Sequence, residues 1–310
     1  MESIVSRLSR DLLIPEAQLR SLARSAPYRY KVYTIPKKTA GERRTIAQPA
    51  REVKILQRWI VANVLADFPV HPSATAYLKG RNILDNARRH LGTRFLLKLD
   101  FKDFFPSIVS GDLRVCLQAR NLELSLPDLD VLCRILFWRP RGTRQLKLSI
   151  GAPSSPALSN VLLYDFDSRI AACCDEREVR YTRYVDDLTF SSNIPGSLQE
   201  IHRAVREICG SMRSPQLQLN EAKMVGTSKK HRRRVTGLLL TNDGEVSLGR
   251  DKKRAIRAGV HQFSQGRLDP PAARRLGGLI AFAHSVEPDF VARLIGRYGV
   301  DVLDRLRHGG

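Results

Sequence analysis

Residues 179–192 read VRYTRYVDDLTFSS, and this stretch decides the fold. Branched, aromatic and polar residues flank Val185, Asp186 and Asp187 on both sides, a pattern typical of two strands that meet at a tight turn. In a regular strand, two adjacent acids point to opposite sides, so one of them would enter the packed face of the sheet. The pair therefore belongs in the turn, either as two solvated acids or as part of a site.

A third acid ends another apolar strand pattern, RFLLKLD at 94–100. Asp100 brought beside Asp186 in one sheet would repel it unless something positive lay between the two carboxylates. Mg²⁺ prefers such hard oxygen ligands and is usually held by one or two carboxylates plus substrate phosphates. Asp100 and Asp186 are therefore candidate ligands of a two-ion phosphoryl-transfer site.

The composition indicates a folded protein with a polyanionic partner. The 310 residues include 52 Lys and Arg against 31 Asp and Glu, a formal net charge of +21, and 43% are hydrophobic. A large positive field attracts nucleic acid, while the hydrophobic fraction is sufficient for packed cores. No apolar run approaches the roughly 18 residues that a membrane span needs, so we expect a cytoplasmic protein without a membrane partner.

The order of the predicted elements indicates an α+β fold, a sheet layered with helices. YRYKVYTI at 28–35 and TIAQP at 45–49 predict a basic hairpin, and QLQLN at 216–220 predicts a strand. The expected units are an N-terminal helical segment (1–25), a mixed module (26–95), a sheet-and-helix module with a helical insertion at 111–148 (96–240), and a basic helical module (241–310).

Three motifs carry a resemblance to a known family. YVDD at 184–187 resembles the catalytic signature of reverse transcriptases, LKLDFKDFFPSI at 97–108 is similar to its partner motif, and GAPSSP at 151–156 lies between them in the order that the family uses. The resemblance implies a right-hand polymerase architecture with fingers (26–95), palm (96–240) and a helical thumb (241–310). It also implies an RNA-directed DNA polymerase that uses two Mg²⁺ ions and dNTP substrates.

The resemblance assigns roles to individual positions. Asp100, Asp186 and Asp187 would be the catalytic acids, and they would hold the metal together with the main chain of Phe101. The residues that would bind the nucleotide are Lys37 or Lys38, Arg44, Asp103, Phe105, Gly151 and Lys223.

The nucleotide-binding positions suit different tasks. Phe105 would pack against the sugar and exclude a 2′-hydroxyl, whereas a core aromatic beside Phe104 is the alternative. Gly151 would let the backbone approach the nucleotide or template, and Ile150 stands where many family members have Gln. Basic side chains on the hairpin would neutralise the triphosphate. Lys223 is either a proton donor to the leaving pyrophosphate or a surface lysine.

Two further motifs narrow the resemblance to retron reverse transcriptases. NARRH at 86–90 matches N-A-x-x-H, with Asn86 and His90 on one face of a predicted helix, and VTG at 235–237 follows a basic run. A satisfied core histidine is the alternative for His90. The residues expected to contact RNA or primer are Asn86, His90, Tyr184, Val235, Thr236 and Gly237.

The retron resemblance implies a particular reaction. The enzyme would bind its cognate structured noncoding RNA, prime from the 2′-hydroxyl of a guanosine in it, and copy part of it. The product would be branched, RNA-linked single-stranded DNA, with an RNA–DNA hybrid bound during synthesis. A separate effector protein and a role in anti-phage defence are further expectations.

Two alternatives come from other classes. A reverse transcriptase of the group II intron or diversity-generating type is disfavoured by N-A-x-x-H together with V-T-G. A polymerase-derived RNA-binding protein that no longer catalyses is disfavoured by the intact acids Asp100, Asp186 and Asp187.

Overall fold

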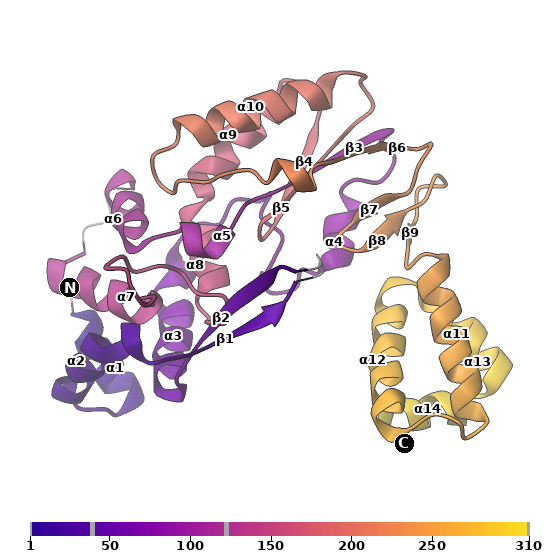
Figure 1. The fold of residues 1–310 in the computed structure, drawn as a ribbon, viewed down its shortest axis with the longest axis horizontal. Helices are drawn as coiled ribbons and strands as arrows, with labels where there is room; N and C mark the ends of the chain where they lie inside the picture. The colour runs from indigo at the N-terminus through magenta and orange to yellow at the C-terminus, as the bar shows by residue number, and fades with distance from the viewer. Residues whose placement is uncertain (1, 38–40, 121–123, 309–310) are drawn as a thin grey trace.

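The computed structural model describes residues 2–37, 41–120 and 124–308, and in these ranges helices surround three small antiparallel sheets (Figure 1). The mixture agrees with the α+β class expected from the sequence. No helix within the described ranges is long and apolar enough to cross a membrane.

The N-terminal part contains the predicted helices and hairpin. Two short helices pack against each other, and a two-stranded hairpin and a long helix follow. These elements are α1 (Ile4–Leu12), α2 (Glu16–Ser25), η1 (Ala26–Tyr28), β1 (Tyr30–Pro36), β2 (Arg43–Pro49), α3 (Arg51–Asn63), η2 (Leu65–Asp67) and α4 (Ile83–Arg88). Helix α3 buries Val53, Leu56 and Ile60, the apolar face that its 3.6-residue spacing predicts.

A four-stranded antiparallel sheet forms the centre of the molecule. Its order is β4-β5-β3-β6, with β3 (Phe95–Asp100), β4 (Arg180–Tyr184), β5 (Asp187–Ser192) and β6 (Val225–Ser228). The register pairs Asp100, the last residue of β3, with Asp187, the first residue of β5. The two acids therefore lie at the same end of the sheet. The hairpin of β4 and β5 is the one that the sequence predicts around the two adjacent acids.

The strand expected at 216–220 is not formed, and this prediction is wrong. Only Leu219 makes an isolated bridge, to Phe101. Two backbone hydrogen bonds form this antiparallel bridge: Asn220 N–H donates to the Asp100 carbonyl and Lys102 N–H donates to the Gln218 carbonyl. The pairing is not continued, because the 3-10 turn η3 (Glu221–Lys223) follows directly, and β6 forms the ladder with β3 instead.

Helices cover the central sheet and extend from it. Helix α9 packs on β4, and α10 packs on β3 and β5. The helices of this part are α5 (Phe104–Ser107), α6 (Ser110–Ala119), α7 (Leu126–Leu136), α8 (Ser155–Leu162), α9 (Tyr164–Asp175), α10 (Ser197–Ser211) and η3 (Glu221–Lys223). Together with the sheet they bury one large core that begins at Ile4 and ends at Leu217.

The C-terminal part has its own sheet, core and helical bundle (Figure 1). Its elements are β7 (Arg233–Val235), β8 (Leu238–Leu240), β9 (Val246–Ser247), α11 (Arg250–Ser264), α12 (Pro270–Val286), α13 (Pro288–Tyr298) and α14 (Val300–His308). The boundary expected at 241 falls between the paired strands β8 and β9. We therefore place the start of this unit at β7.

A buried ion pair fixes the β4–β5 hairpin. Arg183 on β4 and Asp167 on α9 have fully buried side chains, and their closest N···O distance is 2.7 Å. The Arg183 Nη1 also donates to Asn160 Oδ1 at 3.1 Å and to the Val185 carbonyl at 3.2 Å. Tyr181 donates to the same Asp167 carboxylate at 2.7 Å. The Arg183 guanidinium thus links helices α8 and α9 to the turn between β4 and β5.

Loss of the Asp167 charge should destabilise the fold strongly. Asp167→Asn keeps the shape of the side chain but leaves Arg183 charged and uncompensated in the core, which costs about 3–5 kcal/mol. Chemical denaturation of wild type and variant measures this loss. Asp130→Asn, which removes the exposed pair with Arg134, is the control and should change the free energy of unfolding by less than about 0.5 kcal/mol. Equal stability of the two variants would contradict the role given to the buried pair.

Candidate active site

The turn between β4 and β5 presents Asp186 and Asp187. Val185 at its start has φ 62, in the left-handed region that a β-branched residue rarely adopts. The Val185 carbonyl accepts a hydrogen bond from Arg183, and the Asp186 carbonyl accepts one from Phe101 N–H at 3.3 Å. Strain of this kind persists where the surroundings enforce it and is concentrated at functional sites.

The three acids form a cluster of incompletely neutralised negative charge. Burial raises the pKa of Asp186 to about 6, and the charges of Asp100 and Asp187 add to the shift. Burial also raises the pKa of Asp187, and the positive charge of Lys98 offsets part of this shift. Asp100 has a partner, because Lys223 Nζ lies 3.0 Å from its Oδ1. The sequence prediction that strand-end acids would come together is therefore confirmed by the geometry.

The cluster suits a hard cation. Within residues 2–37, 41–120 and 124–308, no three His, Cys, Asp or Glu side chains converge as a ready-made metal cage. Burial raises the pKa of Asp186, and the negative charges of Asp100 and Asp187 add to this shift, so a cation beside the three acids would be favourable. Carboxylate oxygens that repel one another are the ligands that Mg²⁺ neutralises. The residues present thus fit a divalent ion.

The short turn η3 brings Lys223 to Asp100. Backbone bonds from Asn220 to the Asp100 carbonyl hold this segment beside β3. Glu221 on the same turn accepts from His202 Nε2 at 3.1 Å and lies 3.4 Å from Arg206 Nε, and both of these residues belong to α10. Sequence reasoning placed Lys223 near the site only through the family resemblance, since its ion pair depends on contacts 123 residues apart.

A pocket of about 680 Å³ lies between the fingers hairpin and the palm. Phe105, Gly151 and Tyr77 line it. Burial raises the pKa of Tyr77, and the charges of Tyr184 and Asp186 add to the shift. Phe105 is half-buried, with its ring centroid 5.2 Å from that of Phe104. Its ring thus faces the pocket, whereas Phe104 is the core aromatic.

Gly151 makes a close approach to strand β2. Its φ is +122°, and a Cβ there would lie 3.1 Å from the Ala47 carbonyl and 3.2 Å from Ile46 Cγ2 of β2. The adjacent Ile150 carbonyl accepts from Ala47 N–H at 2.9 Å. The missing side chain therefore lets the loop dock on the fingers hairpin, which in turn shapes the pocket that Gly151 lines.

The β1–β2 hairpin and its surroundings carry residues that were predicted to bind the nucleotide, and their environments differ. Lys37 is held by Glu42 at 3.1 Å, and Arg44 is exposed. Lys38 lies outside the described residues. Asp103 is exposed at the start of α5 with φ 45. Of these positions, the described ones do not line the pocket, so the structure leaves their nucleotide contacts as a proposal.

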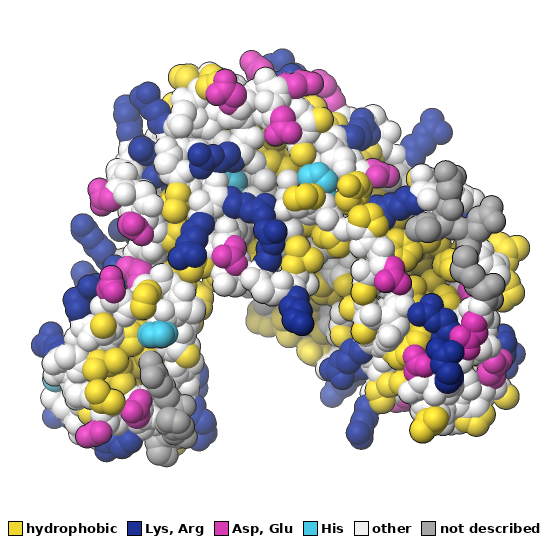
Figure 2. Space-filling model, turned by 180° about the vertical axis from the view of Figure 1, so that it is seen from behind, with side chains coloured by type: hydrophobic (Ala, Val, Ile, Leu, Met, Phe, Trp, Pro, Cys, Tyr) yellow, Lys and Arg dark blue, Asp and Glu magenta, His cyan; other side chains and the backbone are white. Residues whose placement is uncertain are grey.

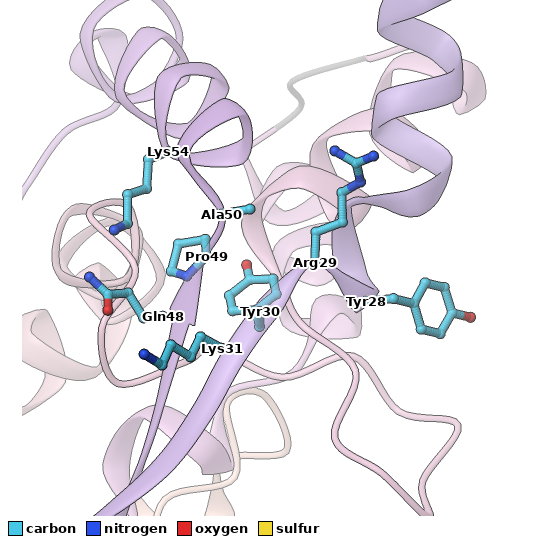
Figure 3. Close-up of a pocket in the computed structure, with 8 residues that line it drawn as sticks. All are labelled: Tyr28, Arg29, Tyr30, Lys31, Gln48, Pro49, Ala50 and Lys54. Carbon is cyan, nitrogen blue, oxygen red and sulfur yellow. The ribbon is translucent and has the colours of Figure 1, made fainter.

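Sequence reasoning missed a set of polar side chains on β2 and α3. Gln48 and Lys54 line both the 680 Å³ pocket and a second pocket of about 540 Å³ at the base of the hairpin. Figure 3 shows Lys31, Gln48 and Lys54 extending to one side of that base and Arg29 and Tyr28 to the other. Arg58 lies one helical turn after Lys54, and this i, i+4 basic spacing in the sequence was the available signal.

The residues expected to contact RNA or primer lie mostly in the interior. Asn86, His90 and Val235 have 0% exposure, so their side chains do not offer the surface that a direct RNA contact needs. Tyr184 and Thr236 are half-buried, and Gly237 is exposed in the β7–β8 turn. For His90, the alternative of a satisfied core histidine describes the structure.

Basic side chains border the hollow between the thumb and the rest of the molecule (Figure 2). The first turns of α11 contribute a small pocket lined only by basic residues, Arg250, Lys253, Arg254 and Arg257. Clustered Lys and Arg of this kind neutralise phosphates independently of sequence. Basic side chains thus gather at the border of the hollow and at the start of α11.

Comparisons with known proteins agree with this arrangement. Residues 35–240 match the reverse transcriptase (RNA-dependent DNA polymerase) family. The retron Ec83 reverse transcriptase of Escherichia coli is 40% identical over 280 residues, covering 90% of this chain and 89% of that protein. The retron Ec86 reverse transcriptase of Escherichia coli is 32% identical over 308 residues, covering 97% and 92%.

Among solved structures, apo telomerase from Candida tropicalis resembles the chain with a TM-score of 0.49 at 11% identity, covering 89% of this chain and 62% of that chain. The fold assignment does not depend on this weak similarity. It follows from the family match, the hairpin that carries the acids, and the succession of hairpin, central sheet and helical bundle. The expected right-hand architecture of fingers, palm and thumb is confirmed, and the chain belongs to the retron-type reverse transcriptases, which are RNA-directed DNA polymerases.

Proposed function

We propose that Asp100, Asp186 and Asp187 are the catalytic acids of Mg²⁺-dependent DNA synthesis. The observation that carries this proposal is the register of β3 and β5, which brings Asp100 beside Asp187 and next to the turn that carries the half-buried Asp186. Two Mg²⁺ ions would supply the Lewis acidity and charge neutralisation that nucleotidyl transfer needs. Asp100, Asp186 and the Phe101 main chain would hold them, with Asp187 as the auxiliary acid.

The neighbouring residues would bind and orient the nucleotide. Phe105 and Gly151 line the 680 Å³ pocket, where the Phe105 ring would exclude a 2′-hydroxyl. Lys37 or Lys38 with Arg44 would neutralise the triphosphate when the hairpin closes over it, because ammonium and guanidinium groups bind phosphate oxygens strongly. Asp103, which is exposed at the start of α5, would also contact the nucleotide.

The template and product would come from a retron RNA. The identities with retron enzymes support a cognate noncoding RNA, priming from a guanosine 2′-hydroxyl, and branched RNA-linked DNA as the product. The hollow bordered by basic side chains (Figure 2) would hold the RNA–DNA hybrid. Anti-phage defence with a separate effector protein is the cellular role that this proposal entails.

Replacement of the turn acids should abolish DNA synthesis. In Asp186→Ala and Asp187→Ala variants, incorporation of dNTPs with Mg²⁺ should fall below about one hundredth of wild type, the loss that follows when more than about 2.7 kcal/mol of transition-state stabilisation disappears. A primer-extension assay with the copurified RNA measures it. Asp243→Asn, on an exposed turn, is the control. Wild-type synthesis by the Asp186→Ala variant would refute the assignment.

Lys223 should act through its proton. Lys223→Arg keeps a positive charge beside Asp100, but a guanidinium does not release a proton at working pH. We expect the single-turnover rate to fall about a hundredfold, the low end for loss of a general acid, with little change in dNTP affinity. Lys230→Arg, at an exposed position, should behave as wild type. Full activity of Lys223→Arg together with slow synthesis by Lys223→Ala would contradict proton transfer by Lys223, because the positive charge alone would then be sufficient.

Neutralising Asp186 should stabilise the metal-free protein. The native pKa lies above the ordinary value of 3.8, so the native state retains a proton between about pH 4 and 6 and stability falls as pH rises through that window. Asp186→Asn should therefore raise the free energy of unfolding by about 1–3 kcal/mol at pH 7.5 with a chelator present. The gain should vanish below about pH 4. Denaturation at both pH values measures it, and a destabilised variant at pH 7.5 would contradict the charge cluster.

A further inference from the structure

Five residues of the two retron motifs have no part in the chemistry proposed above: Asn86, His90, Val235, Thr236 and Gly237. The first three are fully buried, and Thr236 and Gly237 form the β7–β8 turn with positive φ. Their hydrogen bonds run in two directions, toward the hairpin that carries the acids and toward the thumb.

His90 bridges the two strands of the catalytic hairpin. Its Nδ1 lies 2.7 Å from Ser191 Oγ on β5, and its Nε2 lies 2.8 Å from Thr182 Oγ1 on β4. Burial lowers the pKa of His90 to about 3. The ring is therefore neutral, with one donor and one acceptor nitrogen, and the two hydroxyls complement it. One buried ring thus holds both strands that lead into the turn.

Asn86 supports the same hairpin closer to the acids. Its Oδ1 accepts from Thr75 Oγ1 at 3.1 Å, and Thr75 N–H donates to the Arg183 carbonyl at 2.9 Å. Arg183 in turn holds the Val185 carbonyl in the turn. A short chain of hydrogen bonds therefore leads from α4 to the backbone that presents Asp186.

The other side of residues 83–93 is bound to the thumb unit. Thr236 Oγ1 donates to the Ile83 carbonyl at 3.1 Å. Arg233 on β7 is fully buried and donates to the Thr93 carbonyl, and Thr93 Oγ1 donates to the His90 carbonyl at 2.8 Å. The φ of 47° at Thr236 is unfavourable for a β-branched residue, so the surroundings must enforce this turn.

Apolar packing reinforces these bonds. Leu84 and Ala87 of α4 belong to the buried core of the thumb unit, together with Val235 and Leu238. Helix α4 packs against β7, β8 and β9. Helix α4 thus has one face in the thumb core and is hydrogen-bonded to the catalytic hairpin through Asn86 and Thr75. His90 lies in the turn after α4 and not on the helix face that the sequence predicted. Packed interiors of this density transmit displacement with little compression.

We propose that residues 83–93 and the V-T-G turn form a strut that sets the position of the catalytic turn relative to the thumb. Asn86, His90 and Thr236 are positioning residues in this strut. A duplex gripped by the thumb would then present its primer end to the acids at a fixed distance. The inference rests on the catalytic role proposed for Asp186 and Asp187. Because small misplacements of reacting groups reduce rates severely, the strut affects synthesis on every template.

The decisive variant is Thr236→Val, which removes one hydroxyl and keeps the β-branched shape. Its matched control is Thr241→Val in the β8–β9 turn of the same sheet, where the hydroxyl bonds to the backbone of Glu245. Single-turnover dNTP incorporation on a generic annealed primer–template, binding of this duplex and of the copurified RNA by fluorescence anisotropy, and thermal unfolding are measured for both variants.

We expect Thr236→Val to lower the maximal rate about tenfold, within the penalty for misaligned reacting groups. Duplex affinity and dNTP affinity should remain those of wild type, and Thr241→Val should match wild type in rate. An unchanged rate on the generic duplex with loss of binding to the cognate RNA would overturn the strut in favour of a direct RNA contact. An equal rate loss in Thr241→Val would overturn it in favour of general destabilisation.

A second pair of variants tests the palm end. His90→Ala should slow synthesis on the generic duplex, and His90→Gln, which keeps a donor and an acceptor, should recover part of the rate. Equal loss in both variants, or loss of branched product alone, would contradict the proposal. Asp186→Ala in the same assay separates the two ideas: if it retains activity, the catalytic assignment fails, and if it is inactive while Thr236→Val is unaffected, only the strut fails.

Discussion

The buried ion pair between Arg183 and Asp167 is the constraint on which the rest of the site depends. Removing two charges from water is costly, and it is tolerated here because the guanidinium forms several hydrogen bonds at once, to Asp167, Asn160 and the Val185 carbonyl. Through these bonds, helices α8 and α9 determine where the β4–β5 turn lies. The turn can therefore hold a strained Val185 and two adjacent acids that electrostatics alone would drive apart.

The same hairpin is supported from its other side by the segment that carries N-A-x-x-H. His90 contacts both strands, and the V-T-G turn ties this segment to the thumb. In the proposed function, positive charge has two separate tasks. Lys223, which pairs with Asp100, and the basic residues of the hairpin would serve the reacting phosphates, whereas the basic cluster at the start of α11 would serve the nucleic-acid backbone.

Much of this arrangement could be predicted from local sequence. An apolar strand that ends at Asp100 and a hairpin around Asp186 are periodicity signals, and the sheet joins them as expected. Contacts between distant segments could not be predicted in this way. The partner of Arg183 lies 16 residues earlier on a helix. The strand that alternation predicted at 216–220 is reduced to one bridge, because the turn η3 follows it directly. The N-A-x-x-H motif suggested a surface for RNA, yet His90 is buried because its two nitrogens are satisfied by Thr182 and Ser191.

We propose that Asp100 and Asp186 jointly hold two divalent ions. Electron paramagnetic resonance of Mn²⁺, bound in the presence of primer–template and a non-hydrolysable dNTP, detects such a pair. We expect a spin-coupled pair of ions in the wild-type enzyme and no coupled pair in an Asp100→Asn, Asp186→Asn variant that still binds the duplex. A coupled pair that survives both substitutions, or a single uncoupled ion in the wild-type enzyme, would contradict it.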